Sequence, residues 1–168
     1  MVRPYFFISV LFCCIRTASS SAQDVAFISR DVQQLLGEWK GTLAYLDYTS
    51  KKPFTMPANV KISGLANNHQ LVFSNVYPNE PKANNVDTIM LTNHGKMLGR
   101  EVAKSRRLLS NGNIEIVTEY SGVDGNDNKP ALIRCTYTFG KSIFMKRKDV
   151  QFVGYHEWIT RHQYSYGR

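Results

Sequence analysis

The chain has 168 residues, of which 43% are hydrophobic and 20% charged, and its formal net charge is +8. This length suits one domain that can enclose a sizeable core, and no second domain is required. The basic balance favours anionic partners, such as phospholipid headgroups or polysaccharides.

The first residues have the pattern of a secretory signal. Arg3 supplies a positive charge, residues 5–15 are almost uninterruptedly apolar, and small residues at Ser20 and Ala22 fit cleavage before Gln23. Because this apolar stretch is shorter than the ~20 residues that a membrane-spanning helix needs, a removable signal is favoured over a retained anchor. We therefore predict a signal peptide at residues 1–22 and an exported domain at 23–168, periplasmic or extracellular and not integral to a membrane.

Cleavage would change both the cysteine count and the charge. Cys13 and Cys14 would leave with the signal, so that only Cys135 remains and no internal disulfide can form. Cys135 lies in an apolar alternating segment, which indicates a buried, unreactive thiol rather than a nucleophile. Loss of Arg3 and Arg16 would lower the net charge to +6. Outside the cytoplasm, nucleic acid is the least favoured anionic partner.

The hydrophobic period predicts the elements in chain order. Residues 24–36 predict a short helix, because Val32, Leu35 and Leu36 recur at helical spacing after Asp31, a candidate N-cap. From Gly37 the period changes to two, which is typical of half-buried strands. Strands are predicted near 39–45, 59–62, 71–73, 86–92, 96–109, 113–121, 131–139, 142–151 and 153–164. Turn residues separate them, including the hairpin signal at 66–69.

Eight or nine successive strands with short connections define the fold class. With no helix-length segment between them, they predict an all-β fold, a single antiparallel up-and-down barrel with a short N-terminal helix. A two-sheet sandwich stays open, because strand count alone does not distinguish closure from stacking. The basic runs 106–107 and 146–148 are interpreted as solvated strand edges.

Two short motifs, Leu-Gly-Glu-Trp at 36–39 and Thr-Glu-Tyr at 118–120, resemble motifs of the calycins, the superfamily that contains lipocalins and fatty-acid-binding proteins. The first resembles their Gly-x-Trp opening of the first strand, and the second is similar to the lipocalin Thr-Asp-Tyr motif. The resemblance implies that Gly37 and Trp39 are architectural. It also implies that Trp39 closes one end of the barrel while Arg161, from the last strand, packs across it.

Strand parity selects the candidate ligand-binding residues. They are the polar and aromatic residues that share a face with apolar neighbours: Tyr45, Asp47, Phe73, Asn75 and Tyr137. An apolar wall that carries a few hydroxyl and amide groups suits a mostly apolar molecule with a polar end. A packed core with satisfied tyrosines explains the same pattern, so both interpretations stay open.

Catalytic and metal-binding patterns are sparse, so we predict no catalytic residue, no metal and no cofactor. His156 and His162 share parity on a predicted strand, but six residues at ~3.3 Å each separate them by ~20 Å, too far for one metal ion. His69 and His94 fall in predicted turns. An enzyme without a recognisable motif is the least favoured function.

The leading hypothesis is therefore an exported, lipocalin-like carrier or sensor of a small amphipathic or hydrophobic molecule. The alternative is an inert barrel whose basic exterior and loops at 78–85 and 123–130 contact a protein or a polysaccharide.

Overall fold

The computed structural model describes residues 29–47, 50, 52–64 and 69–168. Within this part the elements are α1 Ser29–Gln33, β1 Gly37–Leu46, β2 Pro53–Gly64, β3 Gln70–Val76, η1 Pro81–Ala83, β4 Asn85–Thr92, η2 Asn93–Gly95, β5 Met97–Leu98, β6 Glu101–Leu108, β7 Ile114–Asp124, β8 Lys129–Phe139, β9 Ile143–Phe152 and β10 Ile159–Gly167. The predicted signal peptide at 1–22 and most of the predicted hairpin turn at 66–69 lie outside the described residues.

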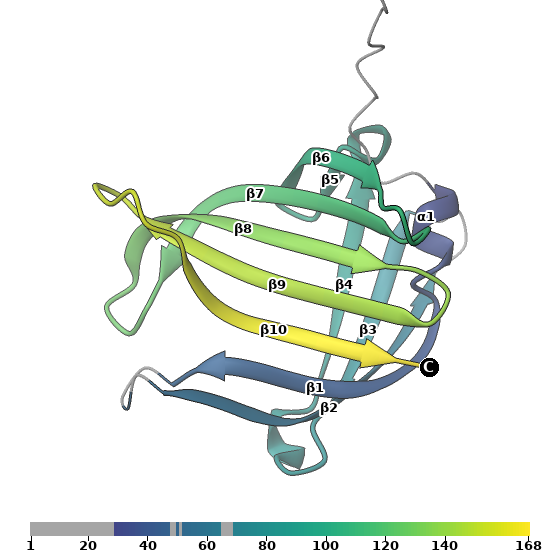
Figure 1. Cartoon of the computed structure of the whole chain (residues 1–168), viewed down its shortest axis with the longest axis horizontal. Helices are drawn as coiled ribbons and strands as arrows, with labels where there is room; N and C mark the ends of the chain where they lie inside the picture. Colours follow the sequence, from purple (N-terminus) through teal and green to yellow (C-terminus); the bar gives the residue numbers. More distant parts are fainter. Residues whose placement is uncertain (1–28, 48–49, 51, 65–68) are drawn as a thin grey trace, which may run out of the picture.

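The strands close into one antiparallel barrel in the order β1-β10-β9-β8-β7-β6-β5-β4-β3-β2 (Figure 1). Pairing of β1 with β10, from Lys40 opposite Gly167 to Tyr45 opposite His162, joins the first strand to the last. The predicted all-β antiparallel barrel is therefore confirmed. One end of the barrel, which we call the α1 end, carries α1 and the C-terminus, and the opposite loop end carries the turn at 125–128 and the loop at 153–158 (Figure 1).

The barrel has ten strands rather than eight or nine, because the predicted strand at 96–109 is two strands. Gly99 breaks it with a φ of +60°, a left-handed conformation that costs glycine little. The last strand also begins later than predicted, at Ile159, since Gly154 turns the chain with a φ of +86°. Residues 153–158 form the connecting loop.

Period-two alternation is clearest in β8. Ile133, Cys135 and Tyr137 are buried while the residues between them are only half-buried, as expected for a strand with one face on the core. Pro57, which lacks an N–H, lies in the part of β2 that pairs with β1 alone, because the β3 pairing begins at Asn59. Proline is tolerated at such edges.

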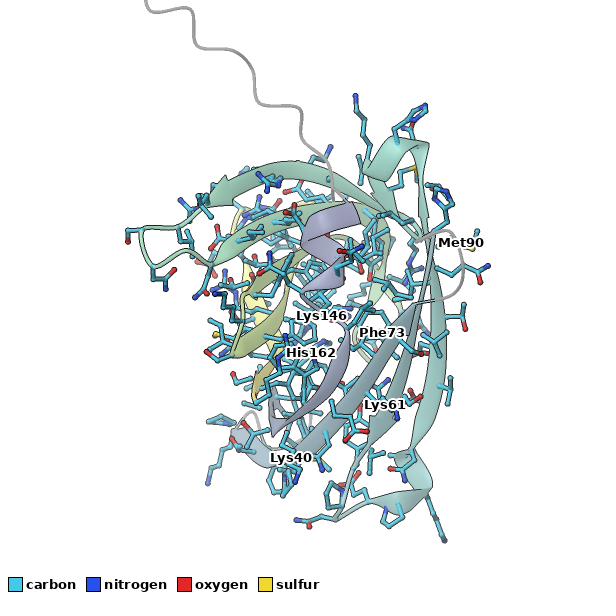
Figure 2. The ribbon with its side chains drawn as sticks, turned by 90° about the vertical axis from the view of Figure 1, so that its right-hand side faces the viewer. Lys40, Lys61, Phe73, Met90, Lys146 and His162 are labelled. Carbon is cyan, nitrogen blue, oxygen red and sulfur yellow. The ribbon has the colours of Figure 1, made fainter. Side chains whose placement is uncertain are left out.

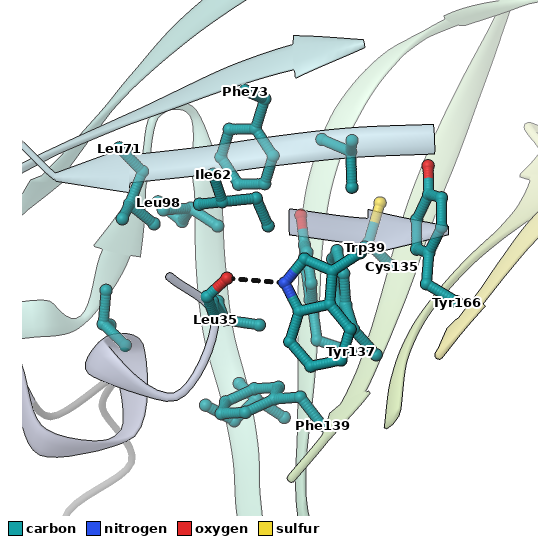
Figure 3. Packing of buried hydrophobic residues seen from close by; sticks show 14 of the residues in the cluster. Leu35, Trp39, Ile62, Leu71, Phe73, Leu98, Cys135, Tyr137, Phe139 and Tyr166 are labelled. Carbon is teal, nitrogen blue, oxygen red and sulfur yellow. Dashed lines mark hydrogen bonds between the residues drawn. The ribbon is translucent and has the colours of Figure 1, made fainter. Parts of the chain in front are cut away.

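The core is centred on Trp39, which is 1% exposed. Its indole Nε1 donates to the backbone oxygen of Leu35 at 2.8 Å (Figure 3). The Phe144 ring packs edge-on against Trp39, with 5.9 Å between centroids. The hydrogen bond joins the start of β1 to the segment that follows α1, and the ring contact joins it to the start of β9.

α1 ends at Gln33 rather than at residue 36, and Asp31 lies inside it rather than before it. Residues 24–28 of the predicted helix lie outside the described residues. Arg106 Nε and Nη2 donate to the Asp31 carboxylate at 2.7 and 2.9 Å. Since Arg106 is half-buried in this pair, the interpretation of residues 106–107 as a solvated edge is wrong for Arg106. No helix among the described residues is long and apolar enough to cross a bilayer.

Candidate functional site

A cavity of ≈ 100 Å³ lies inside the barrel, between the wall of β2, β3 and β4 and the wall of β9 and β10. We call it the luminal cavity. It is lined by Val60, Phe73, Asn75, Asp87, Ile89, Phe144, Lys146, Tyr164 and Tyr166. Figure 2 shows Phe73 and Lys146 in the middle of the barrel. Since pockets for drug-sized ligands usually measure ~300–1,000 Å³, this cavity suits a single ring or a short chain.

These side chains lie in the interior because alternate residues of a strand point to the same face. Phe73 and Asn75 are two residues apart on β3, so both point to the inner face, and β4 contributes two more residues in the same way. Phe144 and Lys146 share the inner face of β9. The result is an apolar wall interrupted by an amide, a carboxylate and an ammonium group.

The rim of the cavity is polar on the β3–β4 side. Asn75 Nδ2 donates to Asn85 Oδ1 at 2.7 Å and lies 3.3 Å from Asp87 Oδ2. Asp87 is exposed and Asn75 half-buried. These groups therefore remain within reach of solvent and of a ligand's polar end.

Tyr164 contributes a hydroxyl on the opposite side. It pairs with Lys146 across β9 and β10, and its hydroxyl lies 2.9 Å from that of Tyr77. Burial and this hydrogen bond raise the pKa of Tyr164 well above its ordinary value. The Tyr164 hydroxyl therefore stays protonated at neutral pH.

A half-buried carboxylate, Glu101, lies next to Lys146 of the cavity lining. Its Oε2 accepts from Thr118 Oγ1 at 2.6 Å and from Tyr137 OH at 2.9 Å. Burial, and then the negative charge of Glu101, raise the pKa of Tyr137 well above normal, so Tyr137 keeps the proton that it donates. Lys146 Nζ lies 3.9 Å from Glu101 Oε1.

A second charged cluster lies toward the loop end. Asp124 accepts from Lys148 Nζ at 2.6 Å and from Arg161 Nε at 2.7 Å, which links β7, β9 and β10. Burial alone would raise the pKa of Asp124, but Lys148 and Arg161 hold it below its ordinary value. The carboxylate is therefore ionised at neutral pH.

The structure brings together two of the five candidate ligand-binding residues, Phe73 and Asn75, at the luminal cavity. Tyr137 is 1% exposed and packs in the core, with its hydroxyl on Glu101. Tyr45 is half-buried against Phe54, with 5.4 Å between ring centroids. Asp47 follows β1, and its Oδ1 accepts from the Ser50 backbone N–H. None of these last three lines the cavity.

The arginine over Trp39 is Arg168, not Arg161. The guanidinium carbon of Arg168 lies 4.0 Å from the Trp39 ring centroid, and Arg168 Nη1 donates to the Leu36 backbone oxygen at 2.7 Å. Arg161 instead contacts Asp124, because it enters the barrel near the loop end of β10. Gly37 has a φ of +118°, and a Cβ there would lie 2.9 Å from Arg168 Nη1, so glycine suits this position.

Sequence reasoning missed Lys146 and Lys148, which were interpreted as part of a solvated edge. Both are half-buried and interact with interior carboxylates. Their parity with buried Phe144 and Val150 was the available signal. Of residues 146–148, only Arg147, which has the opposite parity and is exposed, fits the solvated interpretation.

The cysteine and the histidines form no reactive group. Cys135 is a buried free thiol, and burial raises its pKa to about 12, so it is protonated at neutral pH. His156 is exposed in the loop at 153–158, whereas His162 is half-buried in β10. Across the described ranges, no three His, Cys, Asp or Glu side chains gather as metal ligands.

Comparison with known proteins defines the architecture alone. The closed antiparallel ten-stranded barrel is consistent with a calycin-like barrel. No protein-family model matches the sequence, and no curated protein matches it either. Among solved structures, the chain is similar to the one described as the crystal structure of Rv2717c from M. tuberculosis. The TM-score is 0.50 with 14% sequence identity, over 86% of this chain and 99% of that one.

Proposed function

We propose that this protein is an exported carrier or sensor that binds a small amphipathic molecule in the luminal cavity. The observation that carries the proposal is the composition of that cavity. Phe73, Ile89 and Phe144 supply apolar surface, and Asn75 and Lys146 supply polar groups within the same ≈ 100 Å³. A mostly apolar site with a few convergent polar groups is the usual form of a small-molecule site.

The packing around the cavity favours binding over a filled core. Trp39, Tyr137 and Phe139 fill the interior beside it to exposures of 1% or less, yet the space between Phe73 and Lys146 is left open. Protein interiors contain few voids larger than a water molecule. A residual cavity with both polar and apolar lining is therefore expected to have an occupant.

The predicted signal at residues 1–22 supports the exported setting. In that setting the cavity would hold a molecule from outside the cytoplasm, in the periplasm or the extracellular space. The same barrel without an occupant would leave its outer surface as the functional part, which is the alternative for a protein or polysaccharide partner.

A matched pair of substitutions on β4 tests the proposal. Ile89 lines the cavity, and its neighbour Met90 points outward and is 41% exposed (Figure 2). Ile89→Phe adds bulk inside the cavity, whereas Met90→Phe adds the same ring outside. We expect the neutral one-ring probe 4-fluorotoluene, followed by ¹⁹F NMR, to bind the wild-type protein and Met90→Phe alike. We expect it to bind Ile89→Phe at least about tenfold more weakly, because the added ring occupies the space.

Circular dichroism of both variants establishes that the barrel is retained. Unchanged probe affinity in a folded Ile89→Phe variant would contradict binding in the cavity. A folded wild-type protein that takes up no probe would favour the surface-binding alternative.

A further inference from the structure

Apart from the exposed Asp87 at the cavity rim, the described charged side chains that face the barrel interior are three cations and two carboxylates. Lys146, Lys148 and Arg161 face inward with Glu101 and Asp124. Each of the five side chains is half-buried or buried. Transferring charges out of water is costly unless each is paired, so an uneven set is unfavourable unless something else supplies the missing charge.

The excess positive charge lies at Lys146. Asp124 is shared by Lys148 and Arg161 at 2.6 and 2.7 Å. Glu101 receives hydrogen bonds from two neutral hydroxyls, and the 3.9 Å from its Oε1 to Lys146 Nζ exceeds hydrogen-bond length. Lys146 is therefore the least closely paired of the three interior cations, and the only one of them that lines the luminal cavity.

His162 is consistent with a positive local potential. Burial, and then the charges of Lys146 and Lys148, lower the pKa of His162 to about 4, against an opposing effect of Asp124. The imidazole is therefore neutral at pH 7 and adds no charge to the interior. Figure 2 shows His162 beside the interior on the same side as Lys146.

One further acidic group lies at the cavity. Asp87 lies on the β4 wall of the cavity, is exposed, and has Asn75 Nδ2 at 3.3 Å from its Oδ2. Water screens an exposed carboxylate far better than a half-buried ammonium group. Asp87 therefore marks the rim on the β4 side, and an anion is favoured on the β9 side.

We infer that the ligand of the luminal cavity is a small apolar molecule with an anionic head group, a carboxylate, held by Lys146 Nζ. The inference rests on the proposed function and specifies its ligand class. The apolar part of the ligand packs between Phe73, Ile89 and Phe144. The carboxylate completes the pairing that Glu101 leaves partial, by a charge-assisted hydrogen bond.

The experiment compares three molecules that share one ring and chain and differ only in the head group. 4-Phenylbutyrate, 4-phenylbutanol and 4-phenylbutylamine each compete with 4-fluorotoluene on the wild-type protein at pH 7. We expect phenylbutyrate to displace the probe at a concentration about tenfold or more below that of the alcohol, and the amine to be the weakest.

Two lysine variants test whether Lys146 causes the preference for the carboxylate. Lys146→Met should abolish the advantage of phenylbutyrate over phenylbutanol while the neutral probe still binds. Lys40→Met should keep the advantage, since Lys40 is an exposed lysine on β1 outside the interior (Figure 2). Lys146→Gln provides the same test with a polar side chain. Displacement by the three molecules on the wild-type protein shows, without any variant, whether the acid or the amine is preferred.

Equal displacement by the acid and the alcohol, or a preference for the amine, would overturn the anionic ligand and leave cavity binding intact. An acid preference that survives in Lys146→Met would overturn the role of Lys146. Failure of the probe to bind the wild-type protein is a separate readout, which would overturn the proposed function and this inference together.

Discussion

The two ends of the barrel interior are built from different chemistry. At the α1 end, Trp39 packs with Phe144 and Leu35 and satisfies its one donor through a backbone oxygen. Toward the loop end, Asp124 and Arg161 place charges within the same barrel. Apolar burial stabilises a fold by ~25 cal/mol per Å², whereas burial of charges costs free energy unless pairing offsets it.

This contrast separates an apolar core from a charged interior along the barrel. The α1 end has the composition of an ordinary core and is closed by Arg168 over Trp39. The charged interior departs from that composition, and such departures concentrate at functional sites. The effects of substitutions at the two ends should therefore differ in physical cause as well as in size.

Trp39→Ala should produce the largest loss of stability. Trp39 is 1% exposed and anchors the α1 end, so its removal leaves a large cavity and should lower the free energy of unfolding by about 3–5 kcal/mol. Urea unfolding followed by circular dichroism measures the change. Trp158→Ala is the control, because Trp158 is only half-buried beneath the guanidinium of Arg134 and should cost about 1 kcal/mol. Similar losses in the two variants would remove the special role of Trp39.

Asp124→Asn should have the next largest effect. The change removes the carboxylate that Lys148 and Arg161 share inside the barrel, so the two cations repel each other. We expect the free energy of unfolding at pH 7 to fall by about 3 kcal/mol, which urea unfolding measures. Asp127→Asn, at a carboxylate 72% exposed and paired with Lys129, should change it by less than about 1 kcal/mol. Stability retained in Asp124→Asn would show that the charged cluster is not buried enough to matter.

Much of the fold could be predicted from the sequence because period and turn residues are local properties. The change to period two at Gly37 and the turn residues between strands predicted the antiparallel barrel. The tenth strand was missed because a lone glycine does not show its φ, and Gly99 adopts +60°. Local spacing predicts Asp31 as a helix cap, but its carboxylate pairs with Arg106, 75 positions away in the sequence, which no local pattern shows.

Less of the site could be predicted, because its residues depend on strand register. Parity selected Phe73 and Asn75 correctly as residues of one inner face, but no local pattern shows that β3 lies across the interior from Lys146. A register shift between Thr160 and His162 lets Arg161 and His162, adjacent in sequence, both lie in the interior. Such a bulge interrupts the inward–outward alternation of side chains, so parity alone cannot predict both residues.

The smallest predicted effect is a pH dependence of stability that arises from His162. Substitution of His156 provides the comparison. Burial, followed by the charges of Lys146 and Lys148, lowers the pKa of folded His162 to about 4, with Asp124 acting in the opposite direction. An unfolded histidine has a pKa of ~6.5. Between these values the unfolded chain binds the proton and the folded protein does not, so acidification through this window favours unfolding.

From pH 7 to pH 4.5 this histidine should cost the wild-type protein about 2 kcal/mol of stability. Because glutamine does not titrate, His162→Gln should lose that much less over the same interval, while His156→Gln, at an exposed loop position, should follow the wild-type curve. Urea unfolding of the three proteins at several pH values gives the comparison. A constant difference between His162→Gln and wild type at every pH would mean that the folded interior tolerates a charged imidazole. The excess of cations around Lys146 would then be too well solvated to demand an anionic ligand, so this titration also bears on the charged half of the barrel.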